Sequence, residues 1–299
     1  MKRFSISDIE ALTGIKAHTL RIWEQRYNFF TSKRSETNIR YYDAEDLRLL
    51  QNIATLNHNG YKISRISKMD SSEIDQLVNQ LAQDQYNFGA QVQILSNAAL
   101  RLDEYEFQEK LNLCILEMGF KQAMLDVIFP FFRKIGFMRQ VKTVAIAHEQ
   151  FALHHVCGKI ISETAKLPLI KPIDGNQYLL FLPLNEEQEI SLLFIEYLIK
   201  ESRHSVLYLS AHVSLADLLD AVTIYQPDYA ISVFTKTHAI GEINNLINKV
   251  LEAKADLPLI LIGTKLGDKS IISHNRLKII NDINDFIDQF RSGDISIAS

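Results

Sequence analysis

Leu20-Arg21-Ile22-Trp23-Glu24-Gln25-Arg26-Tyr27 is the stretch that decides the fold of the N-terminal region. It lies in a helical segment that we expect to begin near Ala17. Upstream, Ser7-Asp8-Ile9-Glu10 is a capping-box pattern, which predicts a first short helix that ends at Thr13-Gly14. Two short helices joined by a glycine-containing turn are typical of a helix-turn-helix.

The helical period of that stretch separates two sets of side chains. Leu20, Ile22 and Trp23 are expected to pack largely inward, whereas Arg21, Glu24 and Gln25 occupy another side. Polar side chains near the start of such a helix can meet phosphates or base edges in a major groove. The pattern therefore favours DNA binding, although the same arginines would also suit a plain solvated surface.

Downstream of this helix, the sequence indicates a small hairpin. Ile39-Arg40-Tyr41-Tyr42 is a β-prone run after a polar stretch, which predicts a wing whose arginine and tyrosines can reach the DNA backbone or minor groove. Asp43 then caps a longer helix that stops near Asn59-Gly60, and Ser64 could cap one further turn. Residues 1–70 thus read as a winged helix-turn-helix.

Residues 71–167 carry a helical period throughout and lack glycine-rich turns. Four or five amphipathic helices of this length predict a helical bundle, with a kink at Pro130. Cys114 and Cys157 lie among apolar neighbours and are interpreted as packing residues.

Residues 168–299 change character, because apolar runs of strand length alternate with helical patterns. This predicts a parallel sheet covered on both faces, as in a flavodoxin-like domain. The expected strands are Tyr178–Leu184, Ser205–Leu209, Tyr229–Phe234, Leu257–Gly263 and Leu277–Ile280. The fold class is therefore multidomain α and α/β, with a winged helix-turn-helix, a helical bundle and a five-stranded parallel sheet.

Charge is divided unevenly along the 299 residues. Residues 1–70 hold 12 Lys/Arg against 8 Asp/Glu, and the remainder hold 20 against 28. A basic N-terminal region on an acidic body suits a module that docks on phosphates.

No membrane-spanning run and no signal peptide are apparent, so we expect a cytoplasmic protein without a membrane partner. No acid–base or nucleophile constellation and no paired metal-binding cysteines appear, which predicts a non-enzyme with no catalytic residues and no protein-held metal.

Residues 4–68 resemble the MerR-type winged helix-turn-helix, on Phe4-Ser5-Ile6, Thr13-Gly14-Ile15, Thr19 to Tyr27, Ile39 to Tyr42 and Asp46-Leu47. The resemblance implies a homo-oligomer, dimer or tetramer, on a near-palindromic operator in double-stranded DNA. The DNA-contact candidates that it implies are Lys16, His18, Thr19, Arg21, Arg26, Tyr27, Arg40 and Tyr42. Lys16 stands where the family often has a small capping residue, so we expect a poorly capped helix start.

The branch with this N-terminal region usually carries a cobalamin-binding body, and the order of elements here looks like that body. The residues that bind the ligand in that branch are mostly replaced here. Glu149 is retained, but Arg139 and Gln150 stand where the branch has Trp and His, and Gln188 takes the position of the cobalt-ligating His. An amide is a poor donor to cobalt, so no cofactor is expected, although cobalamin stays possible from the fold resemblance. The candidates for a remodelled ligand groove are Arg139, Glu149, Gln150, Gln188, Ser191, Ser232 and Gly263.

Three functional hypotheses stay open at this point. The first is a sequence-specific transcriptional regulator whose C-terminal region senses a small-molecule ligand or mediates oligomerisation. The second is a regulator with constitutive DNA binding and a ligand-free protein-interaction module. The third is a true cobalamin-dependent sensor of light or vitamin.

Overall fold

A computed structural model describes residues 3–27, 30–34, 40–82, 87–140, 142–171, 175–183, 186, 189–210, 213–264, 266 and 270–292. The chain divides into two compact units, a first unit Met1–Leu153 and a second unit His154–Ser299. The expected division into three domains at 1–70, 71–167 and 168–299 stays a prediction. Each unit is described by itself below.

The first unit begins with helices α1 (Ile6–Thr13) and α2 (Ala17–Tyr27). Ser5, not Ser7, caps α1: its Oγ accepts a hydrogen bond from Asp8 N, and Asp8 Oδ2 accepts one from Ser5 N at 2.8 Å. The expectation for Ser7 was wrong because Asp8 closes the capping box with Ser5, two residues before the Ser7–Glu10 pair. Gly14 ends α1 at φ 72°, the left-handed conformation that glycine adopts at low cost.

A two-stranded hairpin follows, as the sequence predicts. Strands β1 (Lys33–Arg34) and β2 (Arg40–Tyr41) pair antiparallel, and Phe4 and Tyr42 form a further bridge. Asp43 caps α3 (Ala44–His58) as expected. Ser64 lies inside the short α4 (Ile63–Ile66), which begins after Lys62 without a side-chain cap, so Ser64 is not a cap.

The remaining described elements of the first unit are helices, which confirms the expected periodicity. Its elements are α5 (Ser71–Ala82), α6 (Phe88–Arg101), α7 (Glu104–Met118), α8 (Phe120–Ala123), the π-helical turn η1 (Met124–Ile128), α9 (Phe129–Gln140) and the start of α10 (Ile146–Ala165). The wide turn directly precedes Pro130. In a regular α-helix the ring of Pro130 would clash with the carbonyl of Asp126, and in this wider turn Phe129 N bonds to Met124 O, five residues back.

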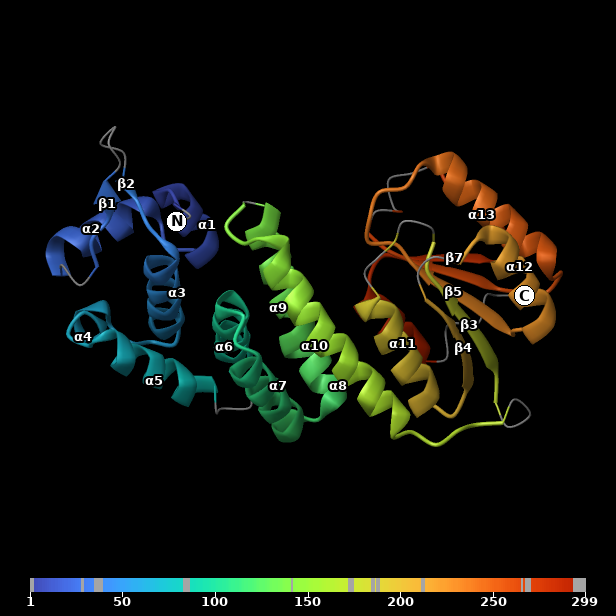
Figure 1. Ribbon diagram of the computed structural model, residues 1–299. Coiled ribbons are helices and arrows are strands. Elements are labelled where there is room, and N and C mark those ends of the chain that lie inside the picture. Colours follow the sequence, from blue (N-terminus) through green and yellow to red (C-terminus); the bar gives the residue numbers. More distant parts are fainter. Residues whose placement is uncertain are drawn as a thin grey trace. The chain divides into compact units, whose positions relative to one another are not determined.

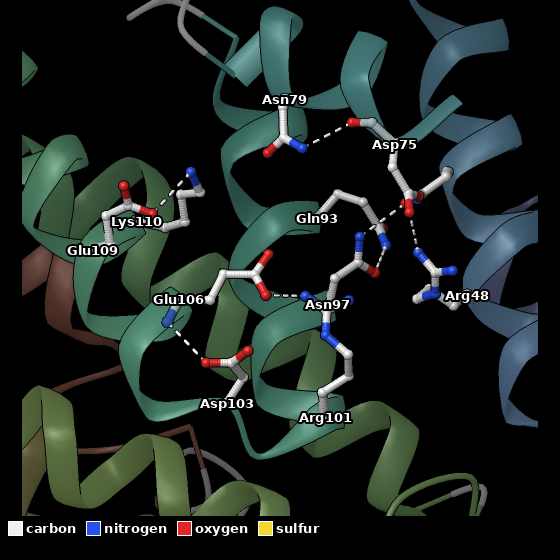
Figure 2. A network of polar contacts seen from close by, with 11 residues as sticks. Arg48, Asp75, Asn79, Gln93, Asn97, Arg101, Asp103, Glu106, Glu109 and Lys110 are labelled. Carbon is white, nitrogen blue, oxygen red and sulfur yellow. Dashed lines mark hydrogen bonds and ion pairs between the residues drawn. The ribbon is translucent and has the colours of Figure 1, made fainter. Parts of the chain in front are cut away.

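Polar side chains connect α3, α5 and α6 (Figure 2). Asp75 accepts hydrogen bonds from Arg48 at 2.6 Å and from Asn52 Nδ2 at 2.7 Å. Asn97 Nδ2 donates to Asn52 Oδ1 at 3.0 Å, and Gln93 Nε2 donates to Asn97 Oδ1 at 2.9 Å. Asn52, Gln93 and Asn97 are buried, so each amide needs these partners.

The second unit contains a five-stranded parallel sheet in the order β4-β3-β5-β6-β7, which confirms the flavodoxin-like prediction. The strands are β3 (Gln177–Phe181), β4 (Ser205–Leu209), β5 (Tyr229–Val233), β6 (Leu259–Ile262) and β7 (Leu277–Ile280). The helices are the end of α10, α11 (Ile190–Glu201), α12 (Leu215–Tyr225), α13 (Ile240–Ala253) and α14 (Ile283–Ser292).

Helices cover both faces of the sheet (Figure 1). The core beneath α12 and α13 includes Leu179, Phe181, Val222, Ile247 and Leu261, all almost fully buried. The strand order reverses next to β3, so the crevice at the carboxyl ends of β3 and β5 is where ligands bind in sheets of this type. No described helix is long and apolar enough to cross a membrane.

Candidate nucleic-acid interface and ligand groove

The surface of α2 and of the turn before it carries exposed cationic side chains. Lys16, Arg21 and Arg26 are exposed, as is His18. Thr19 and Tyr27 are half-buried. These six candidates therefore remain accessible from solvent, and they share one helix and its first turn.

The opposite face of α2 packs into the first unit. Leu20 is 0% exposed and Trp23 is 9% exposed, as expected for core residues. Ile22 is 51% exposed, so its expected packing was wrong. Residues three apart share a helix face, whereas a residue two positions from Leu20 lies on nearly the opposite side.

The start of α2 is capped from α1. Glu10 Oε2 accepts a hydrogen bond from Ala17 N at 3.0 Å, and Glu10 Oε1 lies 3.1 Å from Lys16 Nζ. The bond from Ala17 and the ammonium of Lys16 lower the pKa of Glu10. The helix start, which was expected to be poorly capped at Lys16, is thus capped by Glu10, six positions earlier. A capping rule that considers only neighbouring residues does not find this cap.

Glu24 ties the hairpin region to α2. Its Oε1 accepts hydrogen bonds from the backbone N and the hydroxyl of Ser32, both at 2.6 Å, and its Oε2 lies 4.0 Å from Arg40 Nε. Arg40 is half-buried, with 37% of its side chain exposed. Arg40 therefore reaches solvent next to α2, where the wing was expected to carry it.

Tyr42 is a correction to the set of candidates. It is 1% exposed, and burial raises the pKa of its hydroxyl. The backbone of Tyr42 pairs with Phe4, which turns the side chain into the core, so its hydroxyl does not face a phosphate.

Arg3 is a cationic residue that the sequence analysis did not identify as a candidate. It is exposed, and its guanidinium stacks 4.6 Å from the ring centroid of Tyr41. Its place beside the hairpin depends on the Phe4 bridge, which sequence spacing does not reveal.

The bundle candidates contain an ion pair. Arg139 Nε lies 2.7 Å from Glu149 Oε2, and the Glu149 side chain is 7% exposed. Gln150 is exposed on α10. Arg139 therefore balances the charge of the buried Glu149.

The loop after β3 is organised by Glu186, which is 1% exposed. Its carboxylate accepts hydrogen bonds from Thr235 N at 2.9 Å, from Lys236 N at 3.1 Å and from the Thr235 hydroxyl, and it lies 3.5 Å from His238 Nε2. Burial by itself would raise the pKa of Glu186, but these hydrogen bonds outweigh it and hold the pKa below its ordinary value. Glu186 was not identified from the sequence, because its partners Thr235 and Lys236 lie far along the chain.

The remaining groove candidates lie in the second unit, except that Gln188 falls outside the described residues. Ser191 is half-buried on α11. Ser232, on β5 beside Phe181 in register, is 0% exposed, and its hydroxyl has no hydrogen-bond partner in the described part of the chain. Gly263 meets the loop after β5 so closely that a Cβ would lie 2.3 Å from Phe234 O. Only glycine fits there without movement.

A cavity of about 220 Å³ opens at the carboxyl ends of the strands, against α12 and α13. Its walls are mainly apolar, with His238, Glu242 and Asn245 as polar groups, which is typical of a small-molecule site. None of the groove candidates among the described residues lines it. The lining residues are Phe181, Leu182, Pro183, Val213, Leu215, Leu218, Phe234, His238, Glu242, Ile243, Asn245 and Leu246.

A carboxylate already contacts the histidine that the described residues place at the carboxyl ends of the strands. The imidazole at this edge of the sheet, His238, is 8% exposed and lies against the carboxylate of Glu186. No group of three or more His, Cys, Asp or Glu suited to a metal occurs among the residues described. Burial raises the pKa of Cys114 to about 12 and that of Cys157 to about 11, which keeps both thiols protonated.

Residues 4–73 match the model of the MerR HTH family regulatory protein, so the N-terminal region is a MerR-type helix-turn-helix domain. The chain is 24% identical over 275 residues to the HTH-type transcriptional repressor CarA of Myxococcus xanthus, which covers 90% of each chain. It is 23% identical over 238 residues to the HTH-type transcriptional repressor CarH of the same organism, covering 76% of this chain and 77% of the relative.

Among solved structures, the chain is similar to a monomethylamine corrinoid protein of Methanosarcina barkeri. The TM-score is 0.51 at 8% identity, and the match covers 67% of this chain and 96% of the other. This likeness concerns the fold alone, and it agrees with a helical region followed by an α/β region.

Proposed function

We propose that this chain is a cytoplasmic transcriptional regulator, not an enzyme, whose MerR-type domain binds double-stranded DNA as a homo-oligomer. The observation that carries the proposal is the exposed cationic surface of α2, formed by Lys16, His18, Arg21 and Arg26, next to Arg40 on the hairpin. Two such surfaces related by a two-fold axis suit a near-palindromic operator.

The individual contacts follow from position. Arg21 lies within the first turns of α2, where a guanidinium can form two hydrogen bonds with a guanine edge in the major groove. Lys16 and Arg26 lie toward the two ends of the same helix, and there they suit phosphates, as does Tyr27 through its hydroxyl. Thr19 and His18 add short polar contacts. Arg40 on the hairpin suits the adjacent minor groove.

The C-terminal region supplies the regulatory part of the proposal. An input that changes how copies of this region pack would change whether two DNA-binding domains can occupy one operator. The cavity of about 220 Å³ between the strand ends and α12–α13 favours a mainly apolar small molecule with a few polar groups.

The second candidate function is a cobalamin-responsive regulator. It is favoured by the likeness of fold to a corrinoid protein and opposed by Gln188 at the cobalt-ligand position and by the closed Glu186–His238 contact. A ligand-free interaction module is the remaining alternative.

DNA binding is tested by fluorescence anisotropy with a duplex that the full chain selects from random-sequence DNA. Arg21→Ala should weaken binding by about 10- to 100-fold, the loss typical of a base-contacting arginine. Arg133→Ala, an exposed arginine on α9, is the matched control and should leave affinity unchanged. Log affinity should fall steeply with log salt. Unchanged affinity in Arg21→Ala would contradict the proposed contact surface.

The regulatory part is tested by titrating the full chain with adenosylcobalamin in the dark and in light. Absorbance of the bound corrinoid and oligomer size are the two readouts. We expect no stoichiometric binding, because the donor set lacks an imidazole at the ligand position. A saturable spectral change with a light-dependent oligomer size would support the cobalamin-responsive candidate instead.

A further inference from the structure

A second, polar cavity of about 200 Å³ lies in the first unit, apart from the groove described above. Its walls come from α1 and α3 of the DNA-binding domain and from α6 and α9 of the helical region. Hydroxyl, amide, imidazole and ammonium groups dominate the walls, and none of the described lining residues is acidic. They are Leu12, Thr13, Gln51, Ala54, Thr55, His58, Asn59, Gly89, Gln93 and Lys134.

Lys134 brings an uncompensated positive charge to this cavity. Its Nζ donates a hydrogen bond to Gln93 Oε1, and no carboxylate of the described residues lies within 4.0 Å of it. Burial lowers the pKa of Lys134 to about 8. Lys134 is half-buried, and an ammonium that has lost part of its water is stabilised by an anion or by several acceptors, of which a single amide oxygen supplies little.

Gln51 adds an unused donor to the same cavity. It is 2% exposed, and its Nε2 has no hydrogen-bond partner in the described part of the chain. Its Oε1 lies 3.5 Å from Gln93 Nε2, so Gln51 and Lys134 meet the two ends of one amide side chain. A buried donor without an acceptor costs about 1–3 kcal/mol, which a bound acceptor would recover.

We infer that this cavity binds a small oxyanion, with the chemistry of a phosphate or a short carboxylate, between Lys134, Gln51 and His58. The ammonium supplies charge, the free amide N–H supplies a directed hydrogen bond, and the absence of acidic lining residues among those described avoids repulsion. A volume of about 200 Å³ accommodates such an ion with its remaining water.

An anion in this cavity would affect the position of a helix of the DNA-binding domain. Gln51 and His58 lie on α3, whereas Lys134 lies on α9. An anion held by both helices would stabilise their present arrangement, because it binds the folded cavity and not the separated helices. The site is thus distinct from the groove in the second unit, and its existence does not depend on the identity of any ligand there.

The test is the thermal unfolding midpoint of the full chain in sodium phosphate, in sodium acetate and in sodium chloride at matched ionic strength. We expect the midpoint to rise by a few degrees with the logarithm of phosphate or acetate concentration relative to chloride. A larger rise in phosphate would assign a phosphate group as the ligand, and a larger rise in acetate would assign a carboxylate.

Three variants separate specific binding from a general salt effect. Lys134→Met and Gln51→Glu should lose the anion-dependent rise, the second because it places a carboxylate next to Lys134. Lys68→Met, which removes an exposed lysine of the same unit, should retain it. Equal rises in Lys134→Met and the wild-type chain, or no rise in the wild-type chain and no heat of binding in a calorimetric titration with phosphate, would overturn the inference.

Discussion

On α2 of the first unit, Lys16, Arg21 and Arg26 are exposed, whereas after β3 of the second unit Glu186 is 1% exposed and accepts hydrogen bonds from the loop after β5. One region exposes its charges to solvent, and the other uses a charge to join its own loops. Burial and internal hydrogen bonds therefore separate a structural charge such as Glu186 from an accessible one such as Arg21, even where both lie near an expected site.

The largest effect is expected from a substitution that disturbs the second unit alone. Gly263→Ala should lower the free energy of unfolding of that unit by about 3 kcal/mol, because its Cβ would lie 2.3 Å from Phe234 O. Urea denaturation measures the loss. Gly241→Ala is the control, since nothing lies within 4 Å of its Cβ position on α13, and it should be neutral or slightly stabilising. Equal effects of the two substitutions would contradict the close approach.

Removing the charge of Glu186 should produce the next largest effect. Glu186→Gln should destabilise the second unit by about 2 kcal/mol at pH 7, because a neutral amide replaces a carboxylate that accepts bonds from two backbone N–H groups. The lowered pKa of Glu186 means that its stabilisation is present above the unfolded value of 4.5 and is lost as pH falls through the folded value. The gap between wild type and variant in urea midpoint should therefore shrink below pH 4.5. A gap independent of pH would show that the charge is not responsible.

The cap of α1 offers a smaller effect that sharpens the description of the DNA-binding domain. Ser5→Ala should cost about 1 kcal/mol of stability in the first unit, because it removes the acceptor for Asp8 N. Ser7→Ala, two residues away, should cost less than half as much. Circular dichroism during urea denaturation measures both, and a larger cost for Ser7→Ala would restore the cap expected from the sequence.

The smallest effect is expected at Tyr42. Tyr42→Phe removes a buried hydroxyl that has no hydrogen-bond partner among the described residues, so stability should be unchanged or slightly increased. DNA affinity should also stay within twofold of the wild type, whereas Arg21→Ala weakens it strongly. A marked loss of affinity in Tyr42→Phe would place this tyrosine on the binding surface after all.

Regular elements of this chain were predictable because their signals are local. The apolar runs that begin near Tyr178, Ser205, Tyr229, Leu257 and Leu277 each form a strand, with ends within a few residues of the expectation. Alternation of such runs with helical patterns is sufficient to predict a parallel sheet, since parallel strands need crossover connections.

The site was less predictable because accessibility depends on partners distant in sequence. The burial of Tyr42 follows from its pairing with Phe4, and the engagement of Glu186 follows from Thr235 and Lys236. Lys134 lies in a helical run whose period indicates a bundle, but nothing nearby in the sequence reveals that it bonds to Gln93, which in turn bonds to Gln51. Spacing within one element predicts a face, whereas the neighbours on that face come from packing.

The amides that join α3, α5 and α6 restrict how these helices can shift (Figure 2). Asn52, Gln93 and Asn97 each align a donor with one particular acceptor, and directional bonds do not tolerate gradual sliding as apolar surfaces do. A slip of α6 by one turn would leave several amides unpaired at once. Any rearrangement of these helices would therefore be a single discrete step, in which all of these hydrogen bonds change partners together.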